Sequence, residues 1–558
     1  MDTNQPSYVS GTSDTPLMYK TIGQILDDAA TLWPEQDAVV VCHQNIRWTY
    51  ADLQKQVDAY AAGFASLGLE AGERIGIWSP NNIEWILTQF ASAKAGLILV
   101  NINPAYRTFE LAHALKTSGC AALVLAHDFK GSSYIDMLAE LVPEIEERVP
   151  GEWKSDALPD LRIAAIIGNT RPKGALSFSD IATSDDDPAH AEIATRQSLL
   201  QPDDPINIQF TSGTTGSPKG ATLSHYNIVN NARYVTDRIL LTEHDRLCIP
   251  VPLYHCFGMV MGSLGCVSKG AAMVFPGEAF AAEETLNALS KERCTGVYGV
   301  PTMFVAMLDA LEQGAFDLSQ LRTGIMAGAP CPIEIMRRVV DEMNMRDVTI
   351  CYGMTETAPV SFQSFVDDPI EKRVTTVGRV HPHLEVKIVD EAGQIAPVGQ
   401  KGELCTRGYS VMRGYWEDTE KTNDAIVDGW MHTGDLATLD DEGYCTIAGR
   451  VKDMIIRGGE NIYPKEVEDY LFRHPDVRDA QVFGIANSRF GEIVCAWIVP
   501  NEGASLSEED VKRFCDGQIA HFKIPTHVRI VEALPITVTG KPQKFIMRDW
   551  MIENGFAS

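Results

Sequence analysis

Apolar residues recur with two alternating periods from the start of the chain to about residue 380. After Thr49, the pattern Thr-Tyr-Ala-Asp resembles a helix capping box, and apolar residues then follow at helical spacing until Gly68. The apolar runs that begin at Arg74 and at Gly96 are short and continuous, which is typical of buried strands, and a helical stretch around Trp85 separates them. Strand, helix and strand in alternation predict parallel α/β layers.

The pattern changes near residue 380 and again after Arg450. Short strand-like segments separated by glycine-rich turns come first, and they predict a small β-rich subdomain that closes the larger domain. Beyond Arg450 the apolar pattern restarts with its own helices and strands, so we predict a domain boundary at 450–453. The segments concerned are 384–390, 402–406 and 444–448 before the boundary, and 464–473, 477–484, 492–499 and 508–518 after it.

Length and charge limit the class of protein. A chain of 558 residues with 45% hydrophobic residues is long enough for two or three packed domains. Asp and Glu outnumber Lys and Arg by 75 to 47, which gives a formal charge of -28. Such a surface repels nucleic acid and anionic membranes, so we expect no nucleic-acid partner, and any site for an anionic ligand must gather positive charge locally.

Cysteine usage and the chain's apolar stretches favour a cytoplasmic protein without a transmembrane segment. The twelve cysteines are scattered, with no CxxC pair and no zinc-type His cluster, which is typical of reduced thiols. The first 19 residues contain no Arg and show neither a signal peptide nor a transit peptide. Leu247 to Ser268 lacks acidic and basic residues, but Pro250, Pro252 and His255 interrupt it, so we expect buried core or a pocket wall.

The strongest motif is Thr211-Ser-Gly-Thr-Thr-Gly-Ser-Pro-Lys-Gly220, which follows a strand-like run. Hydroxyl groups can bond phosphate oxygens, glycines let backbone amides approach them, and the lysine adds a positive charge. The order of residues does not fit the P-loop pattern GxxxxGK[ST], and a flexible Ser/Thr/Gly linker is the alternative. The candidate phosphate-binding residues are Thr211, Ser212, Gly213, Thr214, Thr215, Gly216 and Lys219.

This segment resembles the phosphate loop of the acyl-adenylate-forming superfamily, which includes acyl-CoA synthetases, luciferases and peptide-synthetase adenylation domains. Further segments resemble later motifs of that family in the same order: Ala327-Gly-Ala-Pro330, Tyr352-Gly-Met-Thr-Glu-Thr357 and His432-Thr-Gly-Asp435. The resemblance implies a nucleotide site for ATP and AMP, with Mg²⁺ held by a carboxylate, which suits the preference of Mg²⁺ for oxygen ligands. The implied roles are adenine lining by Gly328, Ala329 and Pro330, adenine stacking by Tyr352, ATP and AMP binding by Gly353 and Met354, α-phosphate contact by Thr355, Mg²⁺ binding by Thr211 and Glu356, and ribose binding by Asp435. Thr355 and Glu356 are also catalytic candidates. A turn with an exposed Glu356 is the alternative for the second motif.

The C-terminal part of the chain also resembles this family. The segment from Gly449 to Pro464 matches the family's hinge, which implies Arg450 near the ribose and phosphates and Lys452 as the pivot. Arg457, Gly458, Gly459 and Glu460 would line the channel for coenzyme A, with an ordinary interdomain loop as the alternative. Pro535-Ile-Thr-Val-Thr-Gly-Lys541 resembles the motif of the catalytic lysine, although Pro542-Gln-Lys544 departs from the common Ile-x-Arg continuation.

The implied fold is α/β. A large N-terminal domain (1–449) combines two α/β subdomains with the small β-rich subdomain, a hinge spans 450–453, and a smaller, mobile α+β C-terminal domain (454–558) carries Lys541.

The segments around His255 and Tyr298 are the candidates for binding the acid substrate. His255, which we count among the catalytic candidates, stands where amino-acid-activating relatives usually place an Asp, so an amino acid is a poor candidate. Glycines 258, 262 and 265 are three or four residues apart, and on a helix they would form a groove beside Met259 and Met261. Core packing is the alternative for this stripe. The expected acyl-pocket residues are His255, Gly258, Met259, Gly262, Tyr298 and Gly299.

Taken together, the resemblance implies an AMP-forming ligase that joins a carboxylic acid to coenzyme A through an acyl-adenylate, with medium-chain fatty acyl-CoA synthetases as the most similar class. Another apolar or aryl acid, a stand-alone enzyme that loads a separate carrier protein, a luciferase-like oxygenase and a non-catalytic scaffold are the alternatives. The expected partner is a small carboxylic acid, and a homodimer stays open.

Overall fold

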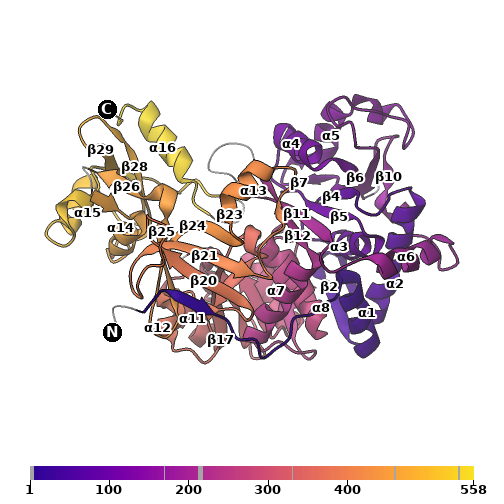
Figure 1. The fold of residues 1–558 in the computed structure, drawn as a ribbon, viewed down its shortest axis with the longest axis horizontal. Helices are drawn as coiled ribbons and strands as arrows, with labels where there is room; N and C mark the ends of the chain where they lie inside the picture. Colours follow the sequence, from indigo (N-terminus) through magenta and orange to yellow (C-terminus); the bar gives the residue numbers. More distant parts are fainter. Residues whose placement is uncertain are drawn as a thin grey trace. The chain divides into compact units, whose positions relative to one another are not determined.

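The computed structural model describes residues 5–168, 170–211, 218–329, 331–457, 460–537 and 541–557, with the side chains of residues 460 and 461 outside the description. By internal contacts the chain divides into two units. The larger unit holds Ser10–Glu385 and Thr406–Met431, and the smaller one holds the residues up to Val9, Val386–Cys405 and the chain from His432 onward. Figure 1 colours the chain along its sequence.

The first sheet of the larger unit has the strand order β10-β9-β6-β4-β5-β11-β12-β22. Neighbours from β10 to β11 are parallel, and the last two pairings, β11 with β12 and β12 with β22, are antiparallel. Its strands are β4 (Arg74–Trp78), β5 (Ile98–Asn101), β6 (Cys120–Ala126), β9 (Ile163–Ile167), β10 (Leu176–Ser177), β11 (Pro205–Thr211), β12 (Lys219–Ser224) and β22 (Gly414–Tyr415).

The second sheet of the larger unit has the order β19-β18-β17-β16-β15-β13-β14-β2-β3. The run from β17 to β2 is parallel, and antiparallel strands flank it at both ends. Its strands are β2 (Asp37–Val41), β3 (Ile46–Thr49), β13 (Arg246–Cys248), β14 (Ala272–Phe275), β15 (Gly296–Gly299), β16 (Thr323–Ala327), β17 (Asp347–Gly353), β18 (Val360–Gln363) and β19 (Arg379–Val380). A short hairpin of β7 (Asp128–Phe129) and β8 (Ser132–Ser133) stands apart.

Helices cover both faces of each sheet because alternate strand residues point to opposite faces. In β4, for example, Ile75 and Ile77 join the central core, while Trp78 joins the core that also contains residues of α4 and α5. The central core, between the two sheets, holds α1 (Ile22–Leu32), α2 (Tyr50–Ser66), α3 (Ile83–Ala95), α7 (His225–Arg238), α8 (Gly265–Lys269) and a π-helix, η4 (Phe257–Leu264). The outer layers are α4 (Thr108–Ser118) and α5 (Tyr134–Leu141) on the first sheet, and α9 (Ala282–Lys291), α10 (Pro301–Leu311) and α11 (Ile333–Glu342) on the second. The remaining helices of the unit are α6 (Ala189–Leu199), α12 (Ile370–Thr375) and α13 (Thr419–Ala425).

A third sheet has the order β1-β20-β21-β24-β23, with β25 paired to β24. Its strands are β1 (Tyr8–Ser10), β20 (Leu384–Val389), β21 (Gly402–Gly408), β23 (Ile426–Val427), β24 (Trp430–Leu439) and β25 (Cys445–Arg450). The smaller unit contains a fourth sheet of β26 (Ile455–Arg457), β27 (Glu460–Ile462), β28 (Val477–Asn487), β29 (Gly491–Pro500) and β30 (His527–Ile530). Helices α14 (Pro464–Leu471), α15 (Glu508–Cys515) and α16 (Lys544–Glu553) pack against it.

The local predictions are confirmed where the sequence pattern was strong. Thr49 caps α2 through its hydroxyl, which accepts a hydrogen bond from the Asp52 amide, and the Asp52 carboxylate in turn accepts from the Thr49 amide. The predicted strands after Arg74 and Gly96 are β4 and β5, and each predicted segment beyond residue 380 contains a helix or strand of the structure. The α/β fold is therefore confirmed, whereas the boundary at 450–453 stays a prediction.

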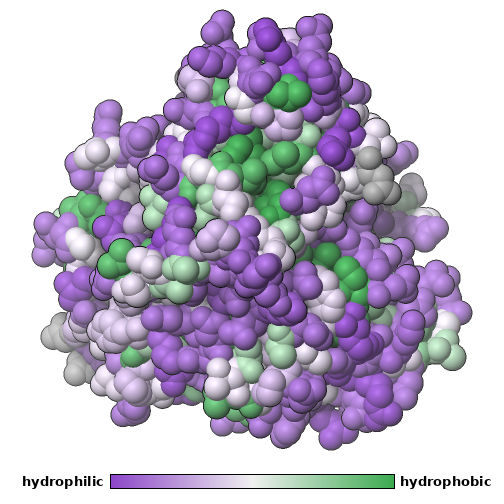
Figure 2. Space-filling model, turned by 90° about the vertical axis from the view of Figure 1, so that its right-hand side faces the viewer, coloured by the Kyte–Doolittle hydropathy of each residue, from purple (hydrophilic) through white to green (hydrophobic). Residues whose placement is uncertain are grey.

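The apolar stretch from Leu247 to Ser268 is mostly buried in the larger unit, where it includes residues of β13, η4 and α8. Across the described part of the chain, none of the helices combines the length and apolar character that crossing a membrane requires. Hydrophilic residues dominate the face shown in Figure 2, and hydrophobic residues gather there in a few patches.

Candidate active site

Four neighbouring parallel strands of the second sheet end at the predicted motifs. The strands β17, β16, β15 and β13 lie side by side in this order. Ligands bind outside the carboxyl ends of the strands in open α/β sheets. The structure therefore brings these motifs to one edge: Tyr352 and Gly353 at the end of β17, Gly328 and Ala329 after β16, Tyr298 and Gly299 in β15, and the segment of His255 after β13.

Two glycines of these motifs are required by the backbone. Gly328 has φ = 90°, which disfavours any side chain, and both Gly328 and Ala329 are exposed at the sheet edge. A Cβ atom on Gly353 would lie 1.7 Å from the carbonyl oxygen of Pro359. The chain can therefore turn sharply after β17, while Pro330 lies outside the described residues.

Tyr352 and Thr355 lie on either side of that turn. The Tyr352 ring is half-buried, 6.3 Å from the Phe362 ring at an angle of 58°, and its register partner on β18 is Phe362. The Met354 amide donates to the Pro359 carbonyl (2.9 Å), and a short 3-10 helix, η5 (Thr355–Thr357), follows. This arrangement holds an aromatic ring and a hydroxyl at the same strand end.

Glu356 is the buried carboxylate of the site, so the alternative of an exposed turn residue is wrong. Its side chain is buried, and its Oε1 accepts hydrogen bonds from the Tyr415 hydroxyl (3.0 Å) and the Thr211 hydroxyl (3.3 Å). The Met412 amide donates to the Glu356 carbonyl (2.9 Å), which fixes the backbone. Burial, and then the Glu356 charge, raise the pKa of Tyr415 well above its usual value, so this phenol stays a donor.

Such a carboxylate fits Mg²⁺. Among the described residues, both side-chain hydrogen bonds reach Oε1, which leaves Oε2 available to a cation, and the Thr211 hydroxyl beside it adds a second oxygen. Hard oxygen donors of this kind are the ligands that Mg²⁺ prefers.

Thr211 and Lys219 face each other across the ends of β11 and β12 as register partners. The Lys219 ammonium lies 4.8 Å from the centre of the Tyr415 ring, a cation–π arrangement. The predicted phosphate ligands between these strands, Ser212, Gly213, Thr214, Thr215 and Gly216, lie outside the described residues. Tyr415 was missed by the sequence analysis, because it lies 59 residues after Glu356 in a segment without a recognisable nucleotide motif.

The segment of His255 begins η4. The His255 ring is half-buried, and its Nδ1 accepts a hydrogen bond from the Phe257 amide (3.2 Å). Tyr298 is fully buried, stacks on Phe257 with ring centres 5.4 Å apart, and donates to the Met261 carbonyl (3.3 Å). A Cβ atom on Gly299 would lie 3.0 Å from the Phe304 ring.

The glycine stripe of this segment contacts protein atoms. A Cβ atom would lie 2.4 Å from the Pro252 carbonyl oxygen at Gly258, 3.1 Å from the Ile249 side chain at Gly262, and 2.8 Å from the Thr236 methyl group at Gly265. This favours the core-packing alternative for the glycines, because their faces are already filled.

Cys256 joins the acyl segment to the nucleotide motif. Its thiol donates to the Gln209 Oε1 (3.0 Å) and forms a hydrogen bond with the Thr355 side chain, while burial raises its pKa to about 12. The thioether sulfur of Met259, three residues later, accepts from the Gln209 amide nitrogen (3.4 Å) and the Asn101 amide nitrogen (3.5 Å). The two predicted sites are therefore direct neighbours within the larger unit.

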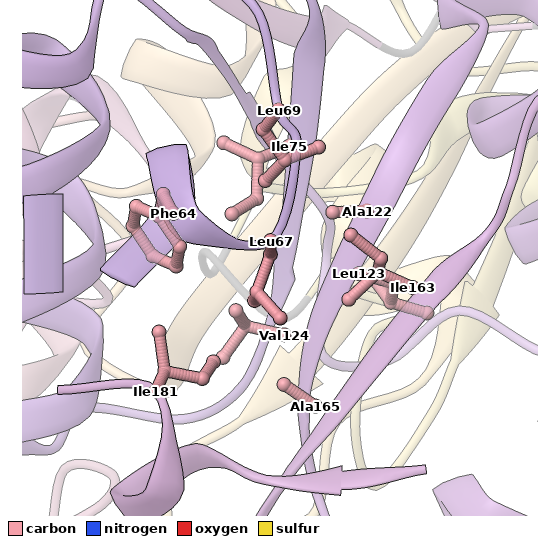
Figure 3. A pocket seen from close by; sticks show the side chains of 10 residues that line it. All are labelled: Phe64, Leu67, Leu69, Ile75, Ala122, Leu123, Val124, Ile163, Ala165 and Ile181. Carbon is pink, nitrogen blue, oxygen red and sulfur yellow. The ribbon is translucent and has the colours of Figure 1, made fainter. Parts of the chain in front are cut away.

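A separate apolar pocket, shown in Figure 3, lies between α2 and the first sheet and is not this site. It has no room for a water molecule. Its lining residues are Phe64, Leu67, Leu69, Ile75, Ala122, Leu123, Val124, Ile163, Ala165 and Ile181, none of which belongs to a predicted motif.

In the smaller unit, Asp435 and Arg450 are register partners on β24 and β25. The Arg450 Nε donates to the Asp435 Oδ1 (3.2 Å), and the arginine side chain is 58% exposed while the carboxylate is 11% exposed. Thr433 accepts from the Asp435 amide (3.1 Å) and tightens the turn at Gly434, whose φ is 71°. Lys452 lies in the next turn, the 3-10 helix η6 (Val451–Asp453), and is exposed.

The coenzyme A candidates flank a hairpin of the fourth sheet. Arg457 ends β26, and its guanidinium donates to the Phe522 carbonyl (2.8 Å) and lies 5.3 Å from the Phe490 ring. Its register partner is Glu460 in β27. Gly458, Gly459 and the Glu460 side chain lie outside the described residues, so the coenzyme A role stays a prediction.

Lys541 is exposed in the smaller unit. Its amide donates to the Thr537 hydroxyl (3.0 Å) and its carbonyl accepts from the Thr537 amide (2.8 Å). Three residues later, the Lys544 ammonium binds the largely buried Glu468 carboxylate on α14 (2.6 Å) and the Val482 carbonyl (2.9 Å). Lys544, which belongs to the unusual sequence after Lys541, is thus held within the smaller unit by an ion pair and a hydrogen bond.

Comparison with known proteins identifies the family. The model of the family described as AMP-binding enzyme matches residues 26–416, and the model of its C-terminal domain matches residues 466–541. The chain belongs to the AMP-binding enzyme family. The predicted membership of the adenylate-forming superfamily is confirmed.

The relatives of this AMP-binding enzyme extend over nearly its whole length. It is 47% identical to the putative acyl-CoA synthetase YngI of Bacillus subtilis (strain 168), over 96% of this chain and 98% of that protein. It is 46% identical to the mitochondrial medium-chain acyl-CoA ligase ACSF2 of Bos taurus, over 98% of this chain and 90% of that protein. Its fold is similar to the crystal structure of the anthranilate CoA ligase AuaEII in complex with anthranoyl-AMP, with a TM-score of 0.83, 26% identity and coverage of 98% and 99% of the two chains.

Proposed function

We propose that this AMP-binding enzyme is an AMP-forming carboxylate–CoA ligase that activates a medium-chain fatty acid with ATP and transfers the acyl group to coenzyme A. The observation that carries the proposal is the buried Glu356 carboxylate, bonded by Thr211 and Tyr415 beside the strand ends that present Tyr352 and Gly328. A carboxylate held in this way suits a metal–nucleotide complex.

In the first half-reaction, a carboxylate oxygen of the acid attacks the α-phosphorus of ATP, the bond to the β-phosphate oxygen breaks, and pyrophosphate leaves with its electron pair. Tyr352 stacks on adenine, Thr355 contacts the α-phosphate, and Asp435 accepts hydrogen bonds from the ribose. Glu356 and Thr211 would hold Mg²⁺, which would supply charge neutralisation at the phosphates. Lys219 and the residues from Ser212 to Gly216 bind phosphate oxygens.

Lys541 completes the first step. Two anions repel each other as the carboxylate approaches the phosphate, so a lysine that bridges both offsets the charge that develops at phosphorus. Arg450 acts near the ribose and phosphates. The exposure of the Lys541 side chain and the internal anchoring of Lys544 support a lysine that is presented to a ligand.

In the second half-reaction, the thiol of coenzyme A attacks the acyl carbonyl, the thiol proton is released, and AMP leaves. We propose that residues 454–558 rotate about the hinge at 450–453, with Lys452 as the pivot, because Lys541 and the thiol need the same side of the small carboxylate. Arg457, Gly458, Gly459 and Glu460 would then line the pantetheine channel.

The acid is proposed from the relatives and from the acyl segment. The two relatives with about 46% identity carry names of acyl-CoA synthetases, one of them medium-chain, whereas the anthranilate ligase is 26% identical. His255 provides no carboxylate for a substrate ammonium, and the surrounding η4 is apolar. An aryl acid is the second candidate, because the fold is similar to that of an aryl-acid ligase.

A panel of acids tests the proposal. Purified protein is incubated with ATP, Mg²⁺ and acids from acetate to long-chain and aryl acids, and AMP formation is measured with and without coenzyme A. We expect turnover that depends on coenzyme A and is greatest with medium-chain acids. Acid-dependent pyrophosphate release without any effect of coenzyme A would indicate a carrier-loading enzyme. Oxygen consumption with light emission would indicate an oxygenase. The absence of acid-dependent pyrophosphate release would indicate a non-catalytic scaffold. We also propose a cytoplasmic location. Light scattering on the same preparation measures the oligomeric state.

A further inference from the structure

Three metal-ligating side chains of different chemistry meet in the smaller unit: Glu403, Cys405 and His432. Glu403 and Cys405 are two residues apart on β21, so their side chains share one face of the strand. His432 lies on β24, the neighbouring strand of the same sheet. One ligand atom from each residue, the glutamate oxygen, the cysteine sulfur and the histidine nitrogen, lies within 4.8 Å of the others.

The distances fit a small metal ion. The His432 Nδ1 lies 2.8 Å from the Glu403 Oε2 and 3.5 Å from the Cys405 Sγ. Tetrahedral zinc with Zn–S near 2.3 Å and Zn–N near 2.0–2.1 Å separates a sulfur and a nitrogen ligand by about 3.6 Å, and a nitrogen and an oxygen ligand by about 3.4 Å. The sulfur and nitrogen are already at that separation, and the carboxylate has to move by about half an ångström.

The carboxylate has a partner that orients it as a ligand. The Glu403 Oε1 accepts a hydrogen bond from the Gly434 amide (3.1 Å), which leaves Oε2 facing the His432 nitrogen. Outer hydrogen bonds of this kind fix metal-binding carboxylates. The side chains of Glu403 and His432 are 26% and 31% exposed, so an ion can enter from solvent.

We propose that Glu403, Cys405 and His432 form a binding site for a borderline-soft divalent cation of the Zn²⁺ class, with one coordination position left to water. Thiolate and imidazole ligands select zinc and related ions over Mg²⁺, so this site is distinct in chemistry from the all-oxygen pair of Thr211 and Glu356. Through the Gly434 amide, the bound ion would also fix the turn that carries Asp435.

The thiol proton must leave when the metal binds. Zinc is bound by the thiolate form of cysteine, so the Cys405 sulfur would bind the ion as a thiolate.

Cobalt titration of the chelator-treated, reduced full-length protein tests the site without any dependence on catalysis. We expect a thiolate-to-cobalt charge-transfer band in the near ultraviolet and visible bands of tetrahedral intensity, both bleached when Zn²⁺ is added, because zinc binds such ligands more tightly than cobalt does. Cys405→Ser should lose the charge-transfer band. The control, Cys42→Ser, removes a different free thiol, which is half-buried in the larger unit, and should leave the spectrum unchanged.

Other outcomes would overturn the proposal. The proposal would be wrong if the unmodified protein showed no charge-transfer band, if the band persisted in Cys405→Ser, or if Cys42→Ser lost the band to the same extent as Cys405→Ser. If Cys405→Ser does not fold, as judged by circular dichroism, Glu403→Gln replaces it: the amide can still accept from Gly434, and we expect cobalt affinity to fall by at least about tenfold. Unchanged affinity in Glu403→Gln would equally refute the site.

Discussion

The hydrogen bond from Tyr415 to Glu356 gives the sharpest test of the proposed metal–nucleotide site. Tyr415→Phe removes only the hydroxyl that donates to the Glu356 Oε1 at 3.0 Å. The ring that faces the Lys219 ammonium at 4.8 Å is retained, so the cation–π contact persists. The substitution therefore isolates the orientation of the buried carboxylate from the packing of the aromatic ring.

The magnitude follows from the environment of Glu356. A hydrogen bond to a charged group contributes about 1.5–3 kcal/mol, and the carboxylate is buried, so water does not replace the lost donor. The Thr211 hydroxyl at 3.3 Å is the side-chain donor that remains. At about 1.4 kcal/mol per tenfold change, the affinity for Mg²⁺ should fall by about 10- to 100-fold, the range typical of lost outer-shell partners.

The assay is acid-dependent pyrophosphate release as a function of free Mg²⁺ at saturating ATP. We expect Tyr415→Phe to raise the Mg²⁺ concentration for half-maximal rate by about 10- to 100-fold. Tyr234→Phe is the matched control, because Tyr234 is also buried and its hydroxyl donates to the Thr15 carbonyl at 2.9 Å. The control should lose stability without any change in Mg²⁺ dependence.

An unchanged Mg²⁺ dependence in Tyr415→Phe, with a loss of stability equal to that of Tyr234→Phe, would refute the reasoning. Glu356 would then be a structural acid rather than a metal ligand. Loss of activity that excess Mg²⁺ does not restore would also contradict an orienting role for the phenol.

Three further predictions address other parts of the chain. Lys452→Pro should slow acyl-CoA formation more than pyrophosphate release, because proline stiffens the proposed pivot; equal losses in single-turnover measurements would count against the hinge. Lys544→Met removes the cation that pairs with the largely buried Glu468 and should lower the free energy of unfolding by about 3–5 kcal/mol in urea titrations. Adding Glu468→Gln should restore more than half of this lost stability. Additive losses from the two substitutions would exclude the ion pair as the cause. Burial lowers the pKa of His225 to about 3, so the unfolded chain binds a proton below pH 6.5 that the folded chain does not, and stability falls as the pH decreases through this window. Between pH 6.5 and 5, the free energy of unfolding of His225→Asn should therefore fall by about 1.6 kcal/mol less than that of the unmodified protein, as measured by denaturant titration at each pH. Identical pH slopes would refute the assignment.

Local secondary structure was predictable because it depends on residues that are close together in the sequence. The apolar period around Leu53 and the hydroxyl of Thr49 specify α2, and the continuous runs after Arg74 and Gly96 specify buried strands. A hydroxyl- and glycine-rich segment after a strand likewise pointed to phosphate chemistry from residue types alone. These features need no information about distant parts of the chain.

The contacts of the glycine stripe on η4 and α8 were not predictable in the same way. Spacing showed that Gly258, Gly262 and Gly265 share a stripe, but the structure shows that this stripe packs on Pro252, Ile249 and Thr236. A period identifies a face of a helix without identifying what meets it. The choice between a groove and close packing depends on the neighbouring chain.

The sequence by itself determined the helices and strands, the α/β layers and the order of the nucleotide motifs, because each depends on residues close together in the chain. Only the tertiary structure decided that Tyr415 donates to Glu356 and that Cys405 lies beside His432. Those partners are carried by different elements, and strand pairing and packing bring them together without any local signal. Long-range contacts of this kind fix the carboxylate of the site and create the candidate metal site.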